Sequence, residues 1–148
     1  MLSTPHMLVG AVITQVIPDP TMSIPLAVAS HFVLDAVPHW DGSAPKPPFK
    51  TRQVTTAAVD YGFGLTLIYF LTLGNPLALL LFAGAISATL PDIFQGILSS
   101  INYFFKKQYL KEFTRFHVAI QGRLPFVMGM VTSSVVSLLA LLFLRFAH

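Results

Sequence analysis

The most unusual stretch of the chain is SHFVLDAVPHWD, residues 30–41, which combines two histidines and two aspartates within an apolar region. If this stretch is helical, His31, Asp35 and His39 are spaced i, i+4 and i+8 and lie along one face. Imidazole and carboxylate groups in such a row are typical ligands of a divalent cation. The spacing therefore predicts a metal site that begins with these three side chains.

The composition indicates an integral membrane protein. Of the 148 residues, 54% are hydrophobic and only 10% are charged, whereas about 25% of the residues in an ordinary soluble domain are charged. A helix needs about 20 apolar residues to cross a hydrocarbon core of about 30 Å. Three segments meet this requirement: Val54–Leu73, Pro76–Leu98 and Pro125–Leu144.

The expected architecture is an all-α, polytopic membrane bundle, a single domain with about five membrane-embedded helices. A helical hairpin over residues 5–40 would combine a short apolar segment at 7–17 with a second one at 23–37. We expect this N-terminal region to be retained, because it lacks the basic start of a signal peptide. The other elements would be a basic loop at 41–53, a helical hairpin at 54–98, a basic amphipathic loop at 99–123 and a final helix at 124–146.

The basic residues predict the orientation of the bundle. Lys and Arg lie mainly in the loops at 41–53 and 99–123, between apolar spans, and cytoplasmic loops of membrane proteins are enriched in these residues. We therefore expect a protein of the bacterial cytoplasmic membrane with both loops in the cytoplasm, and no nucleic-acid partner. The aromatic loop at 99–123 would lie along the membrane surface and contact lipid.

This orientation gathers the polar groups of the membrane segments in one layer. His6 and the row at 31–39 would lie near the cytoplasmic side, and Asp60 and Asp92 would lie within about two helical turns of it. His117 follows in the second basic loop. An ionisable group inside a bilayer costs about 2.5–3.5 kcal/mol, so these carboxylates need partners. A divalent cation would neutralise these carboxylates. The chain has no cysteine, so His and Asp would have to hold that cation.

The chain resembles a group of small bacterial membrane proteins in four motifs: TPHMLVGAV, SHFVLDAVPHWD, ATLPDI, and His117 with a polar residue four positions later. These motifs are similar to those of the bacterial membrane-bound metal-dependent hydrolases. The pattern His-x3-Asp followed by Pro and His is more distantly similar to the zinc-dependent phospholipase C and single-strand nuclease superfamily. Members of that superfamily hold a multinuclear zinc site in a helical bundle and hydrolyse phosphoesters.

The resemblance covers most of the chain to about residue 121 and implies a set of metal ligands. These are His6, His31, Asp35, His39, Asp92 and His117. Relatives often carry His-x3-His at the last motif, whereas this chain has Gln121 at the second position. Since Gln is a poor zinc ligand, this departure implies that one metal ion is absent or weakly held.

We expect an integral membrane metal-dependent hydrolase that acts on a phosphoester or a lipid-linked phosphate. A divalent ion, expected to be zinc, would lower the pKa of a bound water toward about 7. A carboxylate that the ion leaves unliganded, with Asp60 and Asp92 the two candidates, would act as general base. The basic loop at 106–115 would attract an anionic head group. The sequence contains no GxSxG, HExxH or Walker motif, so a serine hydrolase, zincin or NTPase has no support.

Two other functions fit the same residues. In a small ion or proton transporter, or a channel, the buried Asp and His side chains would bind a cation in transit. In a structural protein, a metal ion would only hold the helices together. The hydrolase predicts tightly held metal and turnover, the transporter predicts exchangeable binding and flux, and the structural protein predicts metal-dependent stability alone.

A short internal repeat relates GAVITQVIPD, residues 10–19, to GAISATLPD, residues 84–92. Both segments begin with Gly-Ala and end with Pro-Asp. In the expected topology the two Pro-Asp pairs lie on opposite faces of the membrane. The repeat therefore predicts two similar helix–turn pieces, arranged as an inverted pair, rather than two copies of one site.

Overall fold

The computed structural model describes residues 1–40, 47–48 and 50–146, and over these residues the chain forms seven helices and no strand. The helices are α1 (Ser3–Val16), α2 (Pro20–Ala36), α3 (Thr51–Thr72), α4 (Ala78–Ser87), α5 (Leu90–Phe105), α6 (Lys111–Ile120) and α7 (Phe126–Phe146). The prediction of an all-α fold is confirmed. Most of the predicted basic loop at 41–53 lies outside the described residues.

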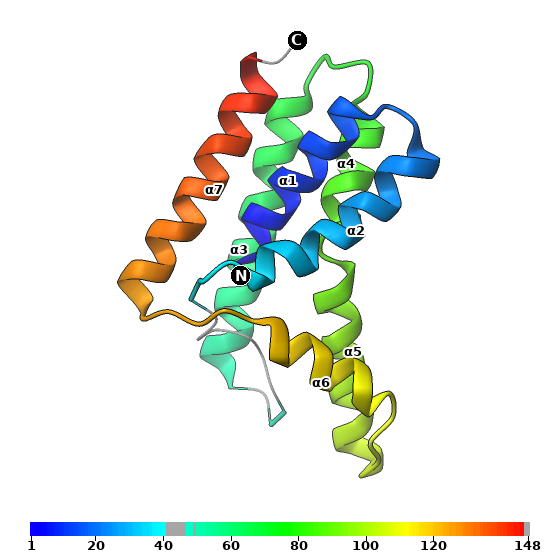
Figure 1. The fold of residues 1–148 in the computed structure, drawn as a ribbon, viewed down its shortest axis with the longest axis vertical. Coiled ribbons are helices and arrows are strands. Elements are labelled where there is room, and N and C mark those ends of the chain that lie inside the picture. The colour runs from blue at the N-terminus through cyan, green and yellow to red at the C-terminus, as the bar shows by residue number, and fades with distance from the viewer. Residues whose placement is uncertain (41–46, 49, 147–148) are drawn as a thin grey trace.

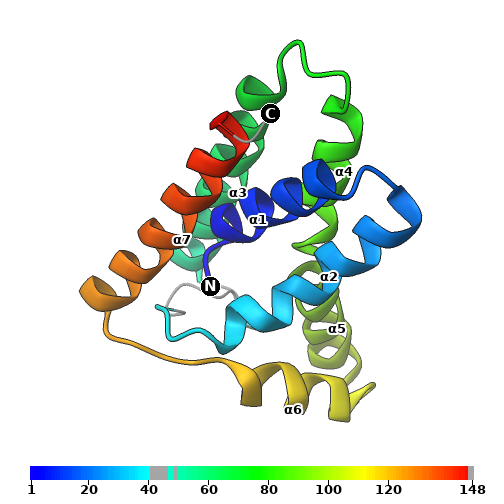
Figure 2. The same ribbon diagram turned by 45° about the horizontal axis from the view of Figure 1, so that its top comes forward.

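Helix α1 forms the centre of the bundle and packs against α2, α3, α4 and α7 (Figures 1 and 2). Its side chains Met7, Leu8 and Ala11 are fully buried, together with Ile68 of α3 and Leu81 of α4. Burying one such Met, Leu or Ile side chain contributes about 1.5–3 kcal/mol. A helix that is apolar around most of its circumference is suited to this central position.

The crossing of α1 and α4 depends on two glycines, Gly10 and Gly84. A Cβ atom at Gly10 would overlap the backbone oxygen of Gly84, and one at Gly84 would overlap the side chain of Thr14. Small residues allow helix backbones to approach closely in membrane proteins. The glycines that begin the two repeated segments therefore face one another across this crossing.

Fewer helices can cross a membrane than the five expected from the sequence. Among the described residues, α3 and α7 are long and apolar enough, and α4 with α5 would add a third if the bent pair is one span. Helices α1 and α2 have only 14 and 17 residues. The expected number was too high because the apolar composition of α1 serves burial in the protein core rather than contact with lipid.

The predicted span at 76–98 is two helices, α4 and α5, that bend by 43° at a break between them. Pro91 lacks an amide hydrogen, so it cannot donate to the carbonyl four residues earlier in a continuous helix. Helix α5 then continues to Phe105 and α6 follows, so helices occupy much of the region predicted as a loop at 99–123. The break places Asp92 in the first turn of α5.

The basic segments lie in one half of the molecule. The starts of α3 and α7 and the end of α5 are in the lower half of Figure 1, away from the connection between α3 and α4 at the top. Lys50, Lys106 and Arg123 border these helix ends. This arrangement is compatible with the expected topology, and the side of the membrane that this half faces stays a prediction.

Candidate metal centre

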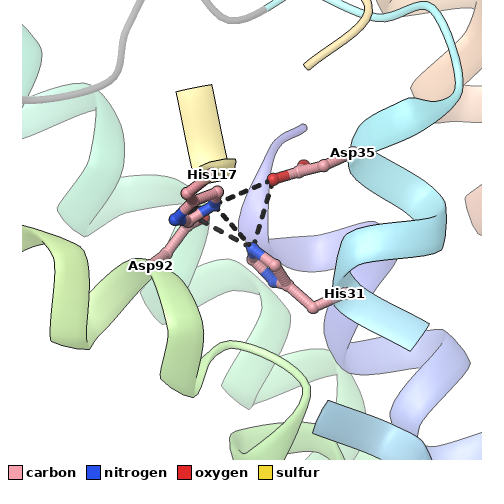
Figure 3. A group of neighbouring side chains, drawn as sticks. All are labelled: His31, Asp35, Asp92 and His117. Carbon is pink, nitrogen blue, oxygen red and sulfur yellow. Dashed lines mark hydrogen bonds and ion pairs between the residues drawn. The ribbon is translucent and has the colours of Figure 1, made fainter. Parts of the chain in front are cut away.

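Four side chains from three helices converge in a cluster, here called the His/Asp cluster (Figure 3). His31 and Asp35 come from α2, Asp92 comes from α5 and His117 comes from α6. One ligand atom of each residue lies within 4.8 Å of the other three. The side chains of His31, Asp35 and His117 are buried, whereas that of Asp92 is 39% exposed. The cluster is therefore most accessible at Asp92.

Five of the distances between the four ligand atoms are close to those around a tetrahedral metal ion. Zinc lies about 2.0–2.1 Å from its nitrogen and oxygen ligands, which gives a tetrahedron with edges of about 3.3–3.4 Å. The Nε2 atoms of His31 and His117 and Oδ2 of Asp35 lie 3.2 Å from one another. Oδ1 of Asp92 lies 3.6 Å and 3.4 Å from the two Nε2 atoms. The cluster could therefore bind a metal ion of this size.

His31 is oriented by the break between α4 and α5. Its Nδ1 donates a hydrogen bond of 2.8 Å to the carbonyl oxygen of Ala88, so Nε2 faces the cluster and carries the lone pair once the ring is neutral. Metal-binding histidines commonly donate their second ring N–H to a carbonyl or carboxylate in this way. Sequence reasoning missed the role of Ala88, although Pro91 signals the helix break that brings this carbonyl to His31.

His117 is positioned by backbone pairing between the segments that follow α2 and α6. The N–H of Gly122 donates to the carbonyl of Asp35 at 2.9 Å, and the N–H of His39 donates to the carbonyl of Gly122 at 2.9 Å. The N–H of Leu124 donates to the carbonyl of His39 at 2.7 Å. A Cβ atom at Gly122 would lie 3.0 Å from the backbone after α2. This close pairing favours glycine and holds α6 beside α2.

His39 and Gln121 lie outside the His/Asp cluster. The Nδ1 of His39 donates to the carbonyl of Val37 at 2.8 Å. The backbone of His39 is hydrogen-bonded to Gly122 and Leu124 and so joins the end of α2 to the segment after α6. Gln121 is the C-terminal cap residue of α6. The structure thus places His39 beside the site as part of its scaffold.

His6 adjoins the cluster through the second oxygen of Asp35. Its Nε2 lies 3.3 Å from Asp35 Oδ1, and its ring stacks on that of His31 with the centroids 4.2 Å apart. The backbone nitrogen of Met1 also donates to Asp35 Oδ1, at 2.7 Å. Asp35 therefore contacts His31 and His117 through one oxygen and His6 through the other.

Burial and the carboxylates shift the pKa values of the two stacked histidines in opposite directions. Both lie on helices outside the candidate spans. Burial lowers the pKa of His6 to about 4. Burial also acts to lower the pKa of His31, but hydrogen bonds to Asp35 and Asp92 outweigh it and raise this pKa to about 9. A metal ion that binds His31 Nε2 must therefore displace a proton.

Asp60, predicted as a general base, belongs to α3 and contacts the start of α1, outside the His/Asp cluster. Its carboxylate accepts hydrogen bonds from the backbone N–H of Ser3 and from Thr4 Oγ1, the latter at 2.7 Å. A carboxylate beside the first turn of a helix stabilises its unpaired N–H groups and its dipole. Asp60 therefore holds the start of α1, and with it His6, against α3.

If Asp60 acts only as this clamp, Asp60→Ala and Thr4→Val should both destabilise the protein without affecting the site. Each removes the bond between the two side chains, and we expect each to lower the free energy of unfolding by about 1 kcal/mol, the usual cost of losing a helix cap. Thermal unfolding measures this loss, and metal content, measured in parallel, should stay at the wild-type value. Loss of turnover in Asp60→Ala but not in Thr4→Val would instead identify Asp60 as a base.

Comparison with protein-family models, curated proteins and solved structures finds no match to this chain. The resemblance to metal-dependent hydrolases therefore rests on the motifs themselves. Any function has to be argued from the geometry of the His/Asp cluster and its surroundings.

Proposed function

We propose that the protein is an integral membrane metal-dependent hydrolase that acts on a phosphoester of a lipid or a lipid-linked substrate. The observation that supports it best is the meeting of four donor atoms from three helices, of which those of His31, Asp35 and His117 have the spacing of ligands around a tetrahedral ion. Buried carboxylates are costly without a compensating charge. The raised pKa of His31 shows that its proton supplies part of that charge to Asp35 and Asp92, and a divalent cation, with zinc our proposal, would take its place.

The distances favour different roles for the four residues. His31, Asp35 and His117 are buried and mutually equidistant at 3.2 Å, and catalytic zinc is commonly held by three protein ligands. Asp92 is partly exposed and lies farther from both histidines. A bound zinc ion would supply a water of lowered pKa and a polarised phosphoryl oxygen. Asp92 would then accept the proton of the attacking water.

The surroundings of Asp92 favour a substrate with an apolar tail. Leu90, Ile93 and Phe94 flank it on α5, and their side chains are 43%, 38% and 44% exposed. Such a surface suits contact with acyl chains, because it costs little free energy when it faces lipid. The substrate could keep its tail in the bilayer while its phosphoester reaches the cluster. Cytoplasmic orientation of the basic residues near 106–115 would bring anionic head groups to this side.

Asp92→Asn separates the general-base role from a ligand role. We expect the variant to keep its bound zinc and to lose at least about 100-fold in kcat, since a general base contributes 10²–10⁴-fold. The measurements are elemental mass spectrometry and release of phosphate or head group from a panel of phosphoesters and lipids. Loss of zinc in step with kcat would instead make Asp92 a required ligand.

The break between α4 and α5 favours cation transport as the second candidate. Transporters often bind ions where a membrane helix is interrupted, and Asp92 lies in the first turn after such a break. The two functions differ in what the wild-type protein does in liposomes. Zinc flux without ester hydrolysis would support transport, whereas hydrolysis without flux would support the proposed enzyme. Metal-dependent stability with neither activity would leave a structural ion.

A further inference from the structure

A row of polar side chains runs along one face of α5, starting at the His/Asp cluster. Asp92, Gln95, Ser99 and Asn102 follow one another at intervals of three, four and three residues, so they share a helix face. All four are partly buried, whereas apolar residues such as Ile97 on the other face are exposed. Helix α5 thus turns its polar face inward and its apolar face outward, as a lipid-facing helix does.

Both ends of this row contact the segment that forms α6 and the residues just before it. At the cluster, Asp92 Oδ1 lies 3.4 Å from His117 Nε2. At the other end, Asn102 Nδ2 donates to the carbonyl of Tyr109 at 3.1 Å, and Asn102 Oδ1 accepts from the N–H of Tyr109 at 2.8 Å. The chain from 109 to 117 therefore follows the row in the opposite direction.

The middle of the row leaves two buried oxygens without hydrogen-bond partners among the described residues. Gln95 Nε2 donates to Ser99 Oγ at 3.0 Å, but Gln95 Oε1 has no partner within that part of the chain. Thr114 lies one turn before His117, and its Oγ1 is likewise buried and unpartnered there. Buried polar groups are almost always hydrogen-bonded, so each of these two oxygens has unused capacity to bond another molecule.

Gln95 and Thr114 lie at the same level of the two segments. The rings of their chain neighbours, Phe94 and Phe113, are in contact with the centroids 5.1 Å apart. Each of the two polar residues is three positions from a member of the cluster, which is about one helical turn or 5 Å. A group bound between them would therefore lie beside a phosphoester held at the cluster.

We propose that Gln95 and Thr114 form a subsite for the hydroxyl groups of a polyol head group, such as glycerol, attached to the substrate's phosphate. This assignment rests on the proposed function for the identity of the molecule. Gln95 Oε1 can only accept a hydrogen bond, and Thr114 Oγ1 can donate or accept one. Neither is charged, so a hydroxyl suits them better than a second phosphate, which has only acceptors when it is fully ionised, or an ammonium group.

The test uses phosphatidylglycerol and phosphatidylethanol, which have the same charge and the same acyl chains but differ in head-group hydroxyls. Their affinities for the zinc-loaded, detergent-purified protein are measured by native mass spectrometry. We expect the wild type to bind phosphatidylglycerol roughly tenfold more tightly, the gain from one or two net hydrogen bonds. The near-isosteric double variant Gln95→Met with Thr114→Val should bind the two lipids equally and keep its zinc.

The matched control is Thr66→Val on α3, where the hydroxyl already donates to the carbonyl of Gly62 at 2.8 Å; it should keep the tenfold preference. Equal binding of the two lipids by the wild type would overturn the subsite, and so would a preference that survives in the double variant. Hydrolysis is scored separately. A preference for the lipid with hydroxyl groups, without turnover, would support the subsite and contradict the hydrolase. Turnover without that preference would support the hydrolase and contradict the subsite.

Discussion

Asp35→Asn is expected to lose the bound metal and all metal-dependent turnover. Asp35 Oδ2 lies 3.2 Å from Nε2 of both His31 and His117, and its Oδ1 lies 3.3 Å from His6 Nε2. Mutation of even an outer-shell partner of a metal costs about 10–100-fold in affinity, so loss of this central ligand should cost more than about 100-fold. Elemental mass spectrometry of the detergent-purified variant beside the wild type gives the result.

The matched control for this change is Asp19→Asn, at the other end of the same helix. Asp19 is exposed and caps α2 by accepting a hydrogen bond of 2.9 Å from the N–H of Thr21, a role that Asn fills equally well. The control should bind metal like the wild type. A full complement of metal in Asp35→Asn would contradict the assignment, and comparison with chelator-treated wild type separates metal loss from misfolding.

Gly10→Ala is expected to destabilise the whole bundle. The new Cβ atom would overlap the backbone oxygen of Gly84 and approach the Cβ of Ala88. Neither group can rotate away as a flexible side chain can, so the helices must separate. Overpacking of this kind typically costs 1–3 kcal/mol, and we expect about 3 kcal/mol or more, measured by unfolding in detergent.

The same substitution should also weaken metal binding, because α1 and α4 both contact the site. Helix α1 carries His6, and the carbonyl of Ala88 at the end of α4 holds the ring of His31. Gly62→Ala on α3 is the control, since no atom outside its own helix backbone and chain neighbours lies within 4 Å of the added Cβ. It should be neutral or stabilising by about 0.5–1 kcal/mol. Equal stability of the two variants would show that the close crossing of α1 and α4 is not required.

Much of the site could be anticipated from residue spacing and depth. The i, i+4 relation places His31 and Asp35 on one face of a helix without knowledge of the rest of the chain. The cost of an unpaired carboxylate in an apolar segment predicts that Asp92 faces a partner. Depth in the membrane alone could not show that Asp92 belongs to the cluster and Asp60 does not, because residues at one level of a bundle can face different neighbours.

The features that sequence reasoning missed depend on long-range contacts. The apolar pattern of α1 suits a membrane-embedded helix as well as a core helix, and only its contacts with four other helices show that it is central. The backbone pairing of His39 with Gly122 and Leu124 joins segments far apart in the chain, and a single sequence holds no record of such pairing. Pro91 indicates a break, but not that the carbonyl of Ala88 would reach His31.

The most direct test of the central claim is X-ray absorption spectroscopy at the zinc edge of protein loaded with one equivalent of zinc. The His/Asp cluster predicts a four-coordinate shell of nitrogen and oxygen at about 2.0–2.1 Å, with the outer scattering of two imidazoles. That result would place the ion between His31, Asp35 and His117. A shell of oxygen atoms without imidazole, or failure of the protein to retain zinc at all, would contradict it.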